Sequence, residues 1–265
     1  LVRLRETLVK DQTRIKNNDG VVFFNLRSDR ARHMTKPFVQ DNFTELNINS
    51  FKRKIVLKDI MFCTLTDFGP DLDDIDSAFP SADIKYTLPA LLAQKKQLYM
   101  AETEKYAHVT YFMNGGYADK VDGEERLHVH SDAIMSYATK PEMKASVLTK
   151  KVLAFLRKKR FDFIAINLAN PDMVGHTGDF KSTVKAIEAV DKCIGLIAKE
   201  VLKHKGCLIV TADHGNAEKM IDLETNEVWG GHTRNPVPFI LVTDNKKKMK
   251  LKKGTLGDIA PTIYE

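Results

Sequence analysis

Three short segments of this sequence carry carboxylate and imidazole side chains at spacings that suit a metal site. Asp172 and His176 lie four residues apart. Asp213 and His214 are adjacent, and His232 lies in a Gly-Gly-His-Thr segment. Mixed carboxylate and imidazole ligands without thiolates suit Mn²⁺ or Zn²⁺, and such ions support phosphoryl transfer and hydrolysis. The segments therefore predict a metal centre that carries out one of these chemistries.

Two of the segments follow apolar runs that predict buried strands. Residues 163–168 precede Asp172, and residues 207–210 come shortly before Asp213. Because open α/β sheets bind their ligands at the carboxyl ends of their strands, we expect both aspartates at that edge. A single Asp-His pair is more often a strand end followed by a capped helix, and His232 alone would fit a solvent-exposed loop. The three segments together favour a metal site.

A second group of residues places positive charge beside predicted strand ends. Arg27 and Arg30 flank the junction between a strand at 21–25 and a helix, and Lys105 follows a strand at 97–100. Helix N-termini favour anions, and arginine binds phosphate and carboxylate groups bidentately. The arginines and Lys105 are therefore candidate anion-binding residues. The alternatives are arginines that face solvent or pair with carboxylates, and an ordinary exposed lysine.

The chain as a whole alternates between predicted strands and helices, which is typical of a mostly parallel sheet flanked by helices. After a charged, helix-like opening stretch, strands are predicted at 21–25, about 55–65, 97–100, 163–168, 207–210 and 237–242. Helices are predicted from about 28, over 142–159 and about 184–201, and at 258–264, with turn and support segments at 114–116 and 123–126. An acidic, proline-containing segment at 67–83 is the best linker candidate. It predicts two α/β lobes, residues 1–75 and 76–265.

Composition narrows the classes of function. The chain has 265 residues, 43% of them hydrophobic, with 41 basic and 35 acidic residues for a net charge of +6. This excess is too small to argue for a nucleic-acid partner. The lysine-rich run 246–253 fits a solvated loop, with an anionic partner as the alternative. Cys63, Cys193 and Cys207 fit reduced core residues of a cytoplasmic protein, and no signal peptide or membrane span is predicted.

The metal segments closely resemble those of one enzyme family. Residues 170–176 read Asn-Pro-Asp-Met-Val-Gly-His, residues 211–216 read Thr-Ala-Asp-His-Gly-Asn, and residues 232–238 read His-Thr-Arg-Asn-Pro-Val-Pro. These are similar to the cofactor-independent phosphoglycerate mutases of the alkaline-phosphatase superfamily. The resemblance covers nearly the whole chain but only about the C-terminal half of the family pattern. It implies an alkaline-phosphatase-like lobe at 76–265 and part of the phosphotransferase, or substrate-binding, lobe at 1–75.

The resemblance implies a reaction and assigns roles to the candidate residues. The intact enzyme would interconvert 3-phosphoglycerate and 2-phosphoglycerate in glycolysis and gluconeogenesis, through a phosphoserine intermediate. Asp172, His176 and His232 would bind one Mn²⁺. Asp213 and His214 would bind a second, together with an aspartate and the nucleophilic serine from an upstream region. Two Mn²⁺ ions are therefore expected in each intact active site.

The same resemblance gives the basic residues a substrate role. Arg27 and Arg30 would hold the phosphoglycerate, and Lys105 would bridge the substrate or the phosphoserine. The segment that carries the family's nucleophilic serine has no match here, and Ser131 and Ser136 lack its context. We therefore expect a fragment that has no turnover alone. The intact enzyme is expected to be a cytoplasmic monomer with a small-molecule substrate and no nucleic-acid or membrane partner.

Two other functions remain open. The first is a different metal-dependent phosphatase or phosphomutase of the same superfamily, although the arginine pair and the Lys105 segment weigh against it. The second is a metal-binding fragment without catalysis, which the missing serine segment favours. A mutase assay beside a metal titration separates these alternatives.

Overall fold

The structure, a computed structural model, describes residues 15–69, 72, 75–80, 84–244 and 251–264. The chain divides into two compact units, Leu1–Ile84 and Lys85–Glu265. The lobe boundary predicted after residue 75 lies within the first unit. The opening stretch and most of the lysine-rich run lie outside the described residues.

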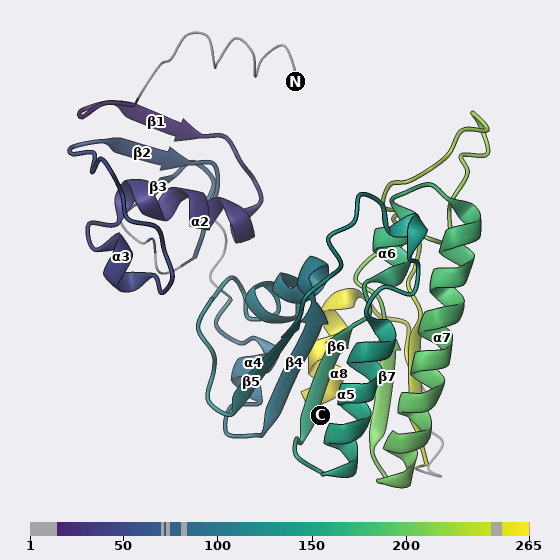
Figure 1. Ribbon diagram of the computed structural model, residues 1–265. Coiled ribbons are helices and arrows are strands. Elements are labelled where there is room, and N and C mark those ends of the chain that lie inside the picture. The colour runs from purple at the N-terminus through teal and green to yellow at the C-terminus, as the bar shows by residue number, and fades with distance from the viewer. Residues whose placement is uncertain (1–14, 70–71, 73–74, 81–83, 245–250, 265) are drawn as a thin grey trace. The chain divides into compact units, whose positions relative to one another are not determined.

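The first unit is a small parallel sheet with helices (Figure 1). Its strands are β1 (Gly20–Phe23), β2 (Met61–Thr64) and β3 (Asp76–Ser77), in the order β1-β2-β3. Its helices are α2 (Ser28–Val39) and α3 (Phe43–Leu46). A core of Ala31, Phe68 and Leu72 joins α2 to the sheet through Phe23. The strand-to-helix junction predicted around Arg27 is present.

Two details of the first unit differ from the sequence prediction. Strand β2 begins at Met61 and not near Ile55, because Asp59 has a φ of 52° and turns the chain just before the strand. Part of the predicted linker pairs with β2 as strand β3. The hydrophobic run that begins at Ile55 is therefore only partly strand.

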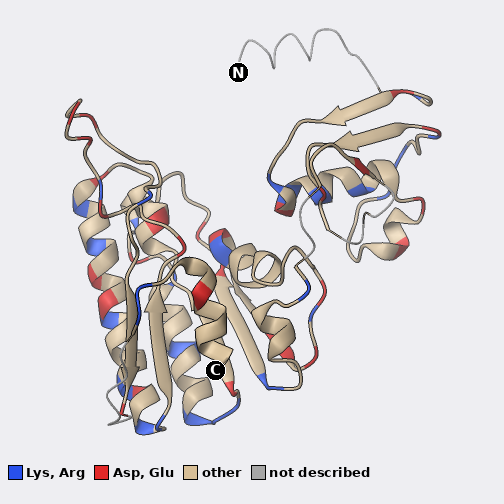
Figure 2. Cartoon of the chain, turned by 180° about the vertical axis from the view of Figure 1, so that it is seen from behind, with Lys and Arg blue, Asp and Glu red and all other residues tan. Residues whose placement is uncertain are grey.

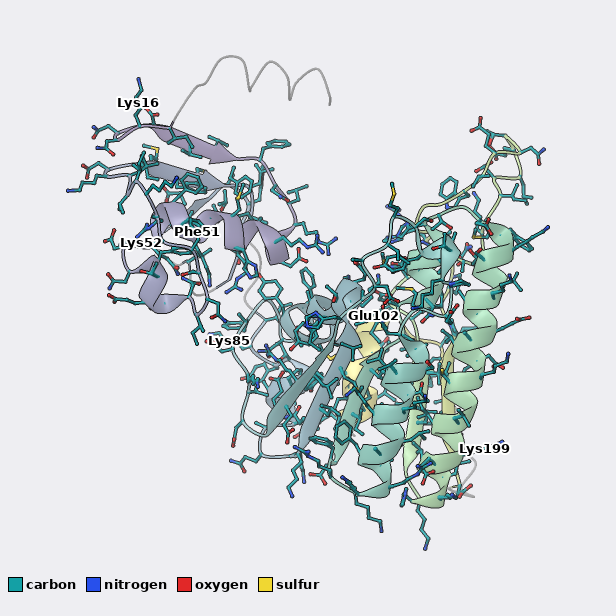
Figure 3. The ribbon with its side chains drawn as sticks, viewed as in Figure 1. Lys16, Phe51, Lys52, Lys85, Glu102 and Lys199 are labelled. Atoms are coloured by element: carbon teal, nitrogen blue, oxygen red, sulfur yellow. The ribbon has the colours of Figure 1, made fainter. Side chains whose placement is uncertain are left out.

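The second unit is built around a buried parallel sheet. Strand β4 (Gln97–Glu102) lies between β5 (Glu124–Val129) and β6 (Phe163–Asn167), and every residue of β4 is buried. Glu102 lies at the end of β4 that leads into the short helix η2 (Thr103–Lys105) (Figure 3). This end of the sheet is where the candidate site residues gather.

Helices cover both faces of this sheet (Figures 1 and 2). On one face, α5 (Ala145–Arg157) and α7 (Phe180–Lys203) pack on Leu98 and Met100 of β4. The contacting side chains are Leu148, Val152, Ile197 and Val201. On the other face, η3 (His108–Phe112) contacts β4 and β6, and its Val109 packs with Tyr99 and Ala101. The short helices α4 (Leu88–Leu91) and α8 (Ile259–Tyr264) contact each other, and η5 (Leu256–Asp258) precedes α8. Burial of these apolar faces, at about 25 cal/mol per Å², drives the packing. Basic and acidic residues are interspersed on the outer side of α7 (Figure 2).

The remaining strands form a two-stranded antiparallel pair. Strand β7 (Cys207–Thr211) pairs with β8 (Phe239–Thr243), and Leu208 packs against the core of the parallel sheet. Both strands were predicted, and β8 runs antiparallel to β7. No helix among the described residues is long and apolar enough to cross a membrane.

Strand β5 corrects the interpretation of residues 123–126 as a turn and support segment. Only Gly123 is a turn residue, with a φ of 77°, and the strand begins at the next residue. Its charged side chains hid the apolar alternation on which strand prediction depends. Glu124 and Arg126 lie on one face of β5 and form an ion pair there.

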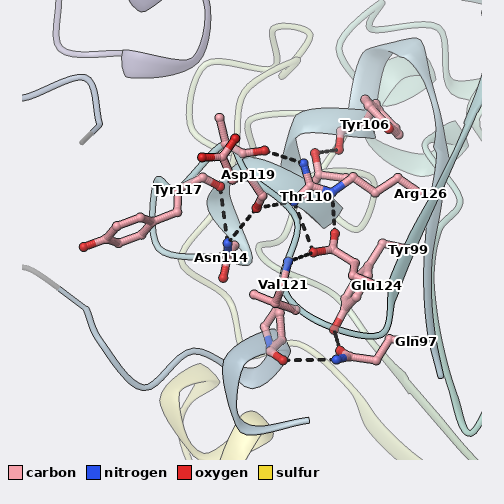
Figure 4. A network of polar contacts seen from close by, with 12 residues as sticks. Gln97, Tyr99, Tyr106, Thr110, Asn114, Tyr117, Asp119, Val121, Glu124 and Arg126 are labelled. Carbon is pink, nitrogen blue, oxygen red and sulfur yellow. Dashed lines mark hydrogen bonds and ion pairs between the residues drawn. The ribbon is translucent and has the colours of Figure 1, made fainter. Parts of the chain in front are cut away.

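This ion pair belongs to a polar network that fixes the loop before β5 (Figure 4). Arg126 Nη1 donates to Ala118 O at 2.6 Å, and the backbone N–H of Val121 donates to Glu124 Oε2 at 2.8 Å. Buried Asn114 donates to the carbonyls of Tyr117 and Asp119. The turn expected at 114–116 is present, with positive φ at both glycines.

Candidate metal centre

Three of the predicted ligands converge at the carboxyl end of the sheet. Asp172 lies in α6 (Asn170–Gly175), which follows β6, and His176 is the residue that ends this helix. His232 comes from the Gly-Gly-His-Thr loop, more than fifty residues later. One ligand atom from each of the three residues lies within 4.8 Å of the others. The expected convergence is present, and metal binding itself stays a prediction.

The distances within this cluster suit a divalent ion. Asp172 Oδ1 lies 3.2 Å from both His176 Nε2 and His232 Nε2, and the two Nε2 atoms are 3.1 Å apart. Ligand bonds of about 2.0–2.2 Å place neighbouring donor atoms roughly 3.3–3.6 Å apart in a tetrahedral shell and roughly 2.8–3.1 Å apart in an octahedral one. The oxygen and the two nitrogens are already spaced for a common ion, so the donor set fits a metal in both its chemistry and its geometry.

A backbone contact fixes the tautomer of one ligand. His176 Nδ1 lies 2.7 Å from the carbonyl oxygen of Gly230, so Nδ1 must donate its proton. The other ring nitrogen, Nε2, faces the cluster, and a proton on Nδ1 leaves Nε2 as the metal-binding atom of a neutral ring, as in metal-bound histidines. The backbone of Gly230 lies close to that of His176. A Cβ at Gly230 would lie only 3.0 Å from His176 O, so a larger residue would fit poorly there.

Asp213 and His214 lie beside the same cluster. They follow β7 directly, as predicted, and His214 Nε2 is 3.8 Å from Asp172 Oδ1. The His214 ring stacks on the His232 ring, with centroids 3.7 Å apart. Asp213 Oδ2 lies 3.6 Å from His214 Nε2, and its side chain is half exposed. The second candidate pair therefore adjoins the first ligand group through Asp172 and His232.

Lys105 is buried and paired with Asp172, so it is not an ordinary exposed lysine. Its Nζ lies 2.5 Å from Asp172 Oδ2, and the residue is only 5% exposed. Burial raises the pKa of Asp172. The hydrogen bond and the positive charge of Lys105 lower it and outweigh burial, so the pKa lies below its usual value. The carboxylate is thus held ionised, as a metal ligand must be.

The pKa of His232 is lowered as well, by burial and by a neighbouring histidine. Burial, followed by the charge of His214, lowers the pKa of His232. A histidine with a lowered pKa stays neutral to more acidic pH, and only the neutral ring can bind a metal. The cluster therefore favours the ligand form of both the carboxylate and this imidazole.

The loops that carry His232 and Asp213 are tied together. The backbone N–H of Thr233 donates to Gly215 O at 2.8 Å. Glu218 accepts hydrogen bonds from Thr233 Oγ1 and, at 2.9 Å, from Asn235 Nδ2. Glu218 was not singled out from the sequence, because its partners lie fifteen and more residues away. These contacts fix the position of the His232 loop relative to the end of β7.

The two predicted substrate arginines lie in the first unit. Arg27 precedes α2, and its Nε and Nη2 contact the two oxygens of Asp29 at 2.7 and 3.0 Å. The Arg27 side chain is 60% exposed, and Arg30 is also exposed. Pairing with a carboxylate, the alternative considered from the sequence, is therefore present for Arg27. The substrate role of both arginines stays a prediction.

Buried Glu102, at the end of β4, binds two later parts of the chain through Ser131 and Lys144. It is fully buried, and it accepts hydrogen bonds from Ser131 Oγ at 2.9 Å and from the backbone N–H of Lys144 at 3.3 Å. Burial raises the pKa of Glu102 above its ordinary value of 4.5, and these two donors only partly oppose that shift. Ser131 is thus occupied in a structural contact, which agrees with leaving it out of the nucleophile role.

We expect Glu102→Gln to flatten the pH dependence of stability. Because the folded-state pKa of Glu102 is raised, the folded chain loses stability as pH rises from about 4.5 through that raised pKa. Glutamine keeps the shape and cannot ionise, so the variant should gain stability relative to the wild type across this window. Urea unfolding at several pH values measures this, with exposed Glu188→Gln as the control. An unchanged pH profile would contradict the prediction.

The comparisons with known proteins identify the superfamily of this chain. The chain belongs to the metalloenzyme superfamily, whose sequence model matches residues 32–265. It is 43% identical, over 97% of its length, to a 2,3-bisphosphoglycerate-independent phosphoglycerate mutase of Clostridium botulinum. It is 46% identical over 95% of its length to the enzyme of that name from Clostridioides difficile. The chain spans about half the length of these relatives, 49% and 48%.

A solved structure agrees as well. The chain is similar to a Leishmania mexicana phosphoglycerate mutase determined at low cobalt concentration, with a TM-score of 0.74 and 30% identity. This match covers 87% of the chain and 44% of the solved chain. The predicted α/β fold of the alkaline-phosphatase type, with parallel sheets flanked by helices, is confirmed by the observed sheets and by this neighbour.

Proposed function

We propose that this chain supplies the metal-binding part of a cofactor-independent phosphoglycerate mutase, which interconverts 3-phosphoglycerate and 2-phosphoglycerate. The observation that carries the proposal is the convergence of Asp172, His176 and His232, with Lys105 bonded to the aspartate. The identity to mutases from Clostridium botulinum and Clostridioides difficile supports the same reaction. A divalent ion, when bound, neutralises phosphate charge and lowers the pKa of a nucleophilic hydroxyl.

Each residue of the site has a separate task in this proposal. His176 and His232 present their Nε2 atoms to the ion, and Asp172 presents one oxygen. Lys105 carries a compact positive charge in a buried position, where it is worth most against a phosphate oxygen. Asp213 and His214 provide two ligands of a second ion site, which other parts of a longer protein would complete. Arg27 and Arg30 hold the phosphoglycerate.

The remaining features of the proposal follow from the same resemblance. The cofactor is Mn²⁺, with two ions in the intact site. The substrate is a small phosphorylated acid, and the intact enzyme works as a cytoplasmic monomer in glycolysis and gluconeogenesis. Its phosphoserine forms on a serine that has no counterpart in these 265 residues. Residues 1–75 belong to the substrate-binding lobe and residues 76–265 to the metal-binding lobe.

The test compares two proteins in one coupled mutase assay with added Mn²⁺. A protein of the relatives' full length that contains this chain should interconvert the phosphoglycerates. The 265-residue chain alone should bind Mn²⁺ without turnover, as the alternative of a non-catalytic metal-binding fragment also expects. A full-length protein that hydrolyses phosphoglycerate without interconverting it would favour the other phosphatases of the superfamily. Turnover by the 265-residue chain would mean that it contains its own nucleophile.

Arg27→Ala in the full-length protein tests the substrate role of the arginines. Losing a charge-assisted contact of about 1.5–3 kcal/mol should lower kcat/KM roughly 10- to 100-fold, with Mn²⁺ affinity unchanged. Arg160→Ala is a matched control, because Arg160 is also half exposed and contacts Glu125 at 2.7 Å. Wild-type kinetics in Arg27→Ala would remove both arginines from the substrate role.

A further inference from the structure

We propose that Asn216 is the positioning residue of the metal centre, and that its amide aims one oxygen of Asp172 at the two histidines. This inference rests on the proposed metal site. Asn216 has no titratable group and was not singled out from the sequence, although it closes the Thr-Ala-Asp-His-Gly-Asn segment. Unlike an ordinary buried asparagine, it donates a hydrogen bond to a candidate metal ligand, Asp172.

Asn216 and Lys105 each contact a different oxygen of the Asp172 carboxylate. Asn216 Nδ2 donates to Oδ1 at 3.1 Å, and Lys105 Nζ contacts Oδ2 at 2.5 Å. Both donors are 5% exposed, so water competes little for either oxygen. Rotation of the carboxylate would break two buried contacts at once.

This arrangement leaves one direction free for a metal. Each carboxylate oxygen has two lone pairs, and the amide of Asn216 uses one of those on Oδ1. The other can face the histidine nitrogens, which lie 3.2 Å away. Because Oδ2 is occupied by Lys105, Asp172 is set to bind through one oxygen. Partners of this kind commonly set ligand orientation in metal sites.

The helix that carries Asp172 is shaped to admit Asn216. A Cβ at Gly175 would overlap Asn216 Oδ1 and would lie only 3.0 Å from its Cγ. The bare backbone of α6 therefore lets the amide pack against the same turn that carries Asp172 and His176. Asn216 Oδ1 has no hydrogen-bond partner among the described residues. The side chain is thus held by the steric fit to Gly175 and by the contact with Asp172.

Asn216 also links the two groups of candidate ligands. It lies two residues after His214, and its backbone carbonyl accepts from Lys219 N at 3.1 Å. A shift of the segment that carries Asp213 and His214 would therefore move the amide that orients Asp172.

A double-mutant cycle at Asn216 and Gly175 tests the proposal on the 265-residue chain. Isothermal titration with Mn²⁺ is measured for the wild type, Asn216→Ala, Gly175→Ala and the double variant. Asn216→Ala should weaken binding by about 10- to 100-fold, the usual effect of losing an orienting partner. Gly175→Ala should also weaken it, because the new methyl group displaces the amide. The double variant should bind like Asn216→Ala, because the displaced side chain is gone.

Two further measurements separate positioning from packing. Asn114→Ala removes an equally buried asparagine that does not contact the candidate ligands, and it should leave Mn²⁺ affinity unchanged. The visible absorption spectrum of bound Co²⁺ reports ligand geometry, and only the Asn216 and Gly175 variants should alter it. If Asn216→Ala does not fold, Gly175→Ala alone carries the test by the same two measurements.

The outcomes distinguish this inference from the metal site itself. A wild-type chain that binds no Mn²⁺ would overturn both. A wild type that binds, with Asn216→Ala binding equally well and giving the same Co²⁺ spectrum, would overturn only the role of Asn216. Fully additive losses in the double variant would also overturn it, because the two residues would then act independently.

Discussion

Replacing Asp172 by alanine should remove Mn²⁺ binding from the candidate centre. Asp172 is the only carboxylate in the three-residue cluster, and its Oδ1 lies 3.2 Å from both histidine nitrogens. Without it, only two imidazole rings remain, beside the buried side chain of Lys105. The loss of affinity should be at least about 100-fold, the upper end of what losing a mere orienting partner costs.

Isothermal titration of Asp172→Ala against the wild type measures this loss. Asp132→Ala is the matched control, because Asp132 is also a carboxylate paired with lysines, at 2.8 Å from Lys140 and 2.5 Å from Lys144. It lies outside the cluster and should keep wild-type affinity. Mn²⁺ binding by Asp172→Ala at the wild-type affinity would place the ion elsewhere in the protein.

Replacing Lys105 by methionine should have the largest effect on the stability of the metal-free chain. The side chains of Lys105 and Asp172 are only 7% and 15% exposed, so solvent screens their ion pair weakly. Removing one partner leaves the other charge buried, which typically costs about 3–5 kcal/mol. The double variant with Asp172→Ala should lose less than the sum of the two single losses, because no isolated charge remains.

Urea unfolding of the wild type, Lys105→Met, Asp172→Ala and the double variant measures this coupling. Lys203→Met is the control, because Lys203 is 71% exposed and lies 3.8 Å from Glu200, so solvent screens this ion pair strongly. Additive losses at positions 105 and 172 would argue against a coupled buried pair.

The pH dependence of this pair has a defined sign. The folded-state pKa of Asp172 is lowered, so its contribution to stability is present above the unfolded pKa and is lost as pH falls through the folded pKa. The difference between the wild type and Lys105→Met should therefore shrink in acid.

The residues that converge at the candidate centre could be predicted because they lie in short segments with distinctive spacing. Asp172 and His176 are one helical turn apart, and Asp213 follows an apolar strand directly. The contacts that orient them could not be predicted, because they join distant parts of the chain. Lys105 meets Asp172 across 67 positions, and Asn216 meets it across 44. The four-residue spacing of Asp172 and His176 does not by itself distinguish a helix from a loop, and in the structure Asp172 lies in α6, which ends at His176.

The fold could be predicted where burial leaves a simple pattern. The long apolar periodicity of α7 and the runs of β4, β6 and β7 identified these elements. Strand β5 escaped because an ion pair occupies one of its faces, and tertiary hydrogen bonds stabilise it instead of an apolar pattern. The direction of β8 also depends on the partner strand, which local sequence does not specify.

Anomalous X-ray scattering from a Mn²⁺-soaked crystal of the 265-residue chain tests the metal centre most directly. Data collected at the manganese absorption edge should show a peak bounded by Asp172 Oδ1, His176 Nε2 and His232 Nε2, at about 2.0–2.2 Å from each atom. The same peak should be absent from a crystal of Asp172→Ala. A peak away from these three side chains, or none in the wild type, would contradict the account.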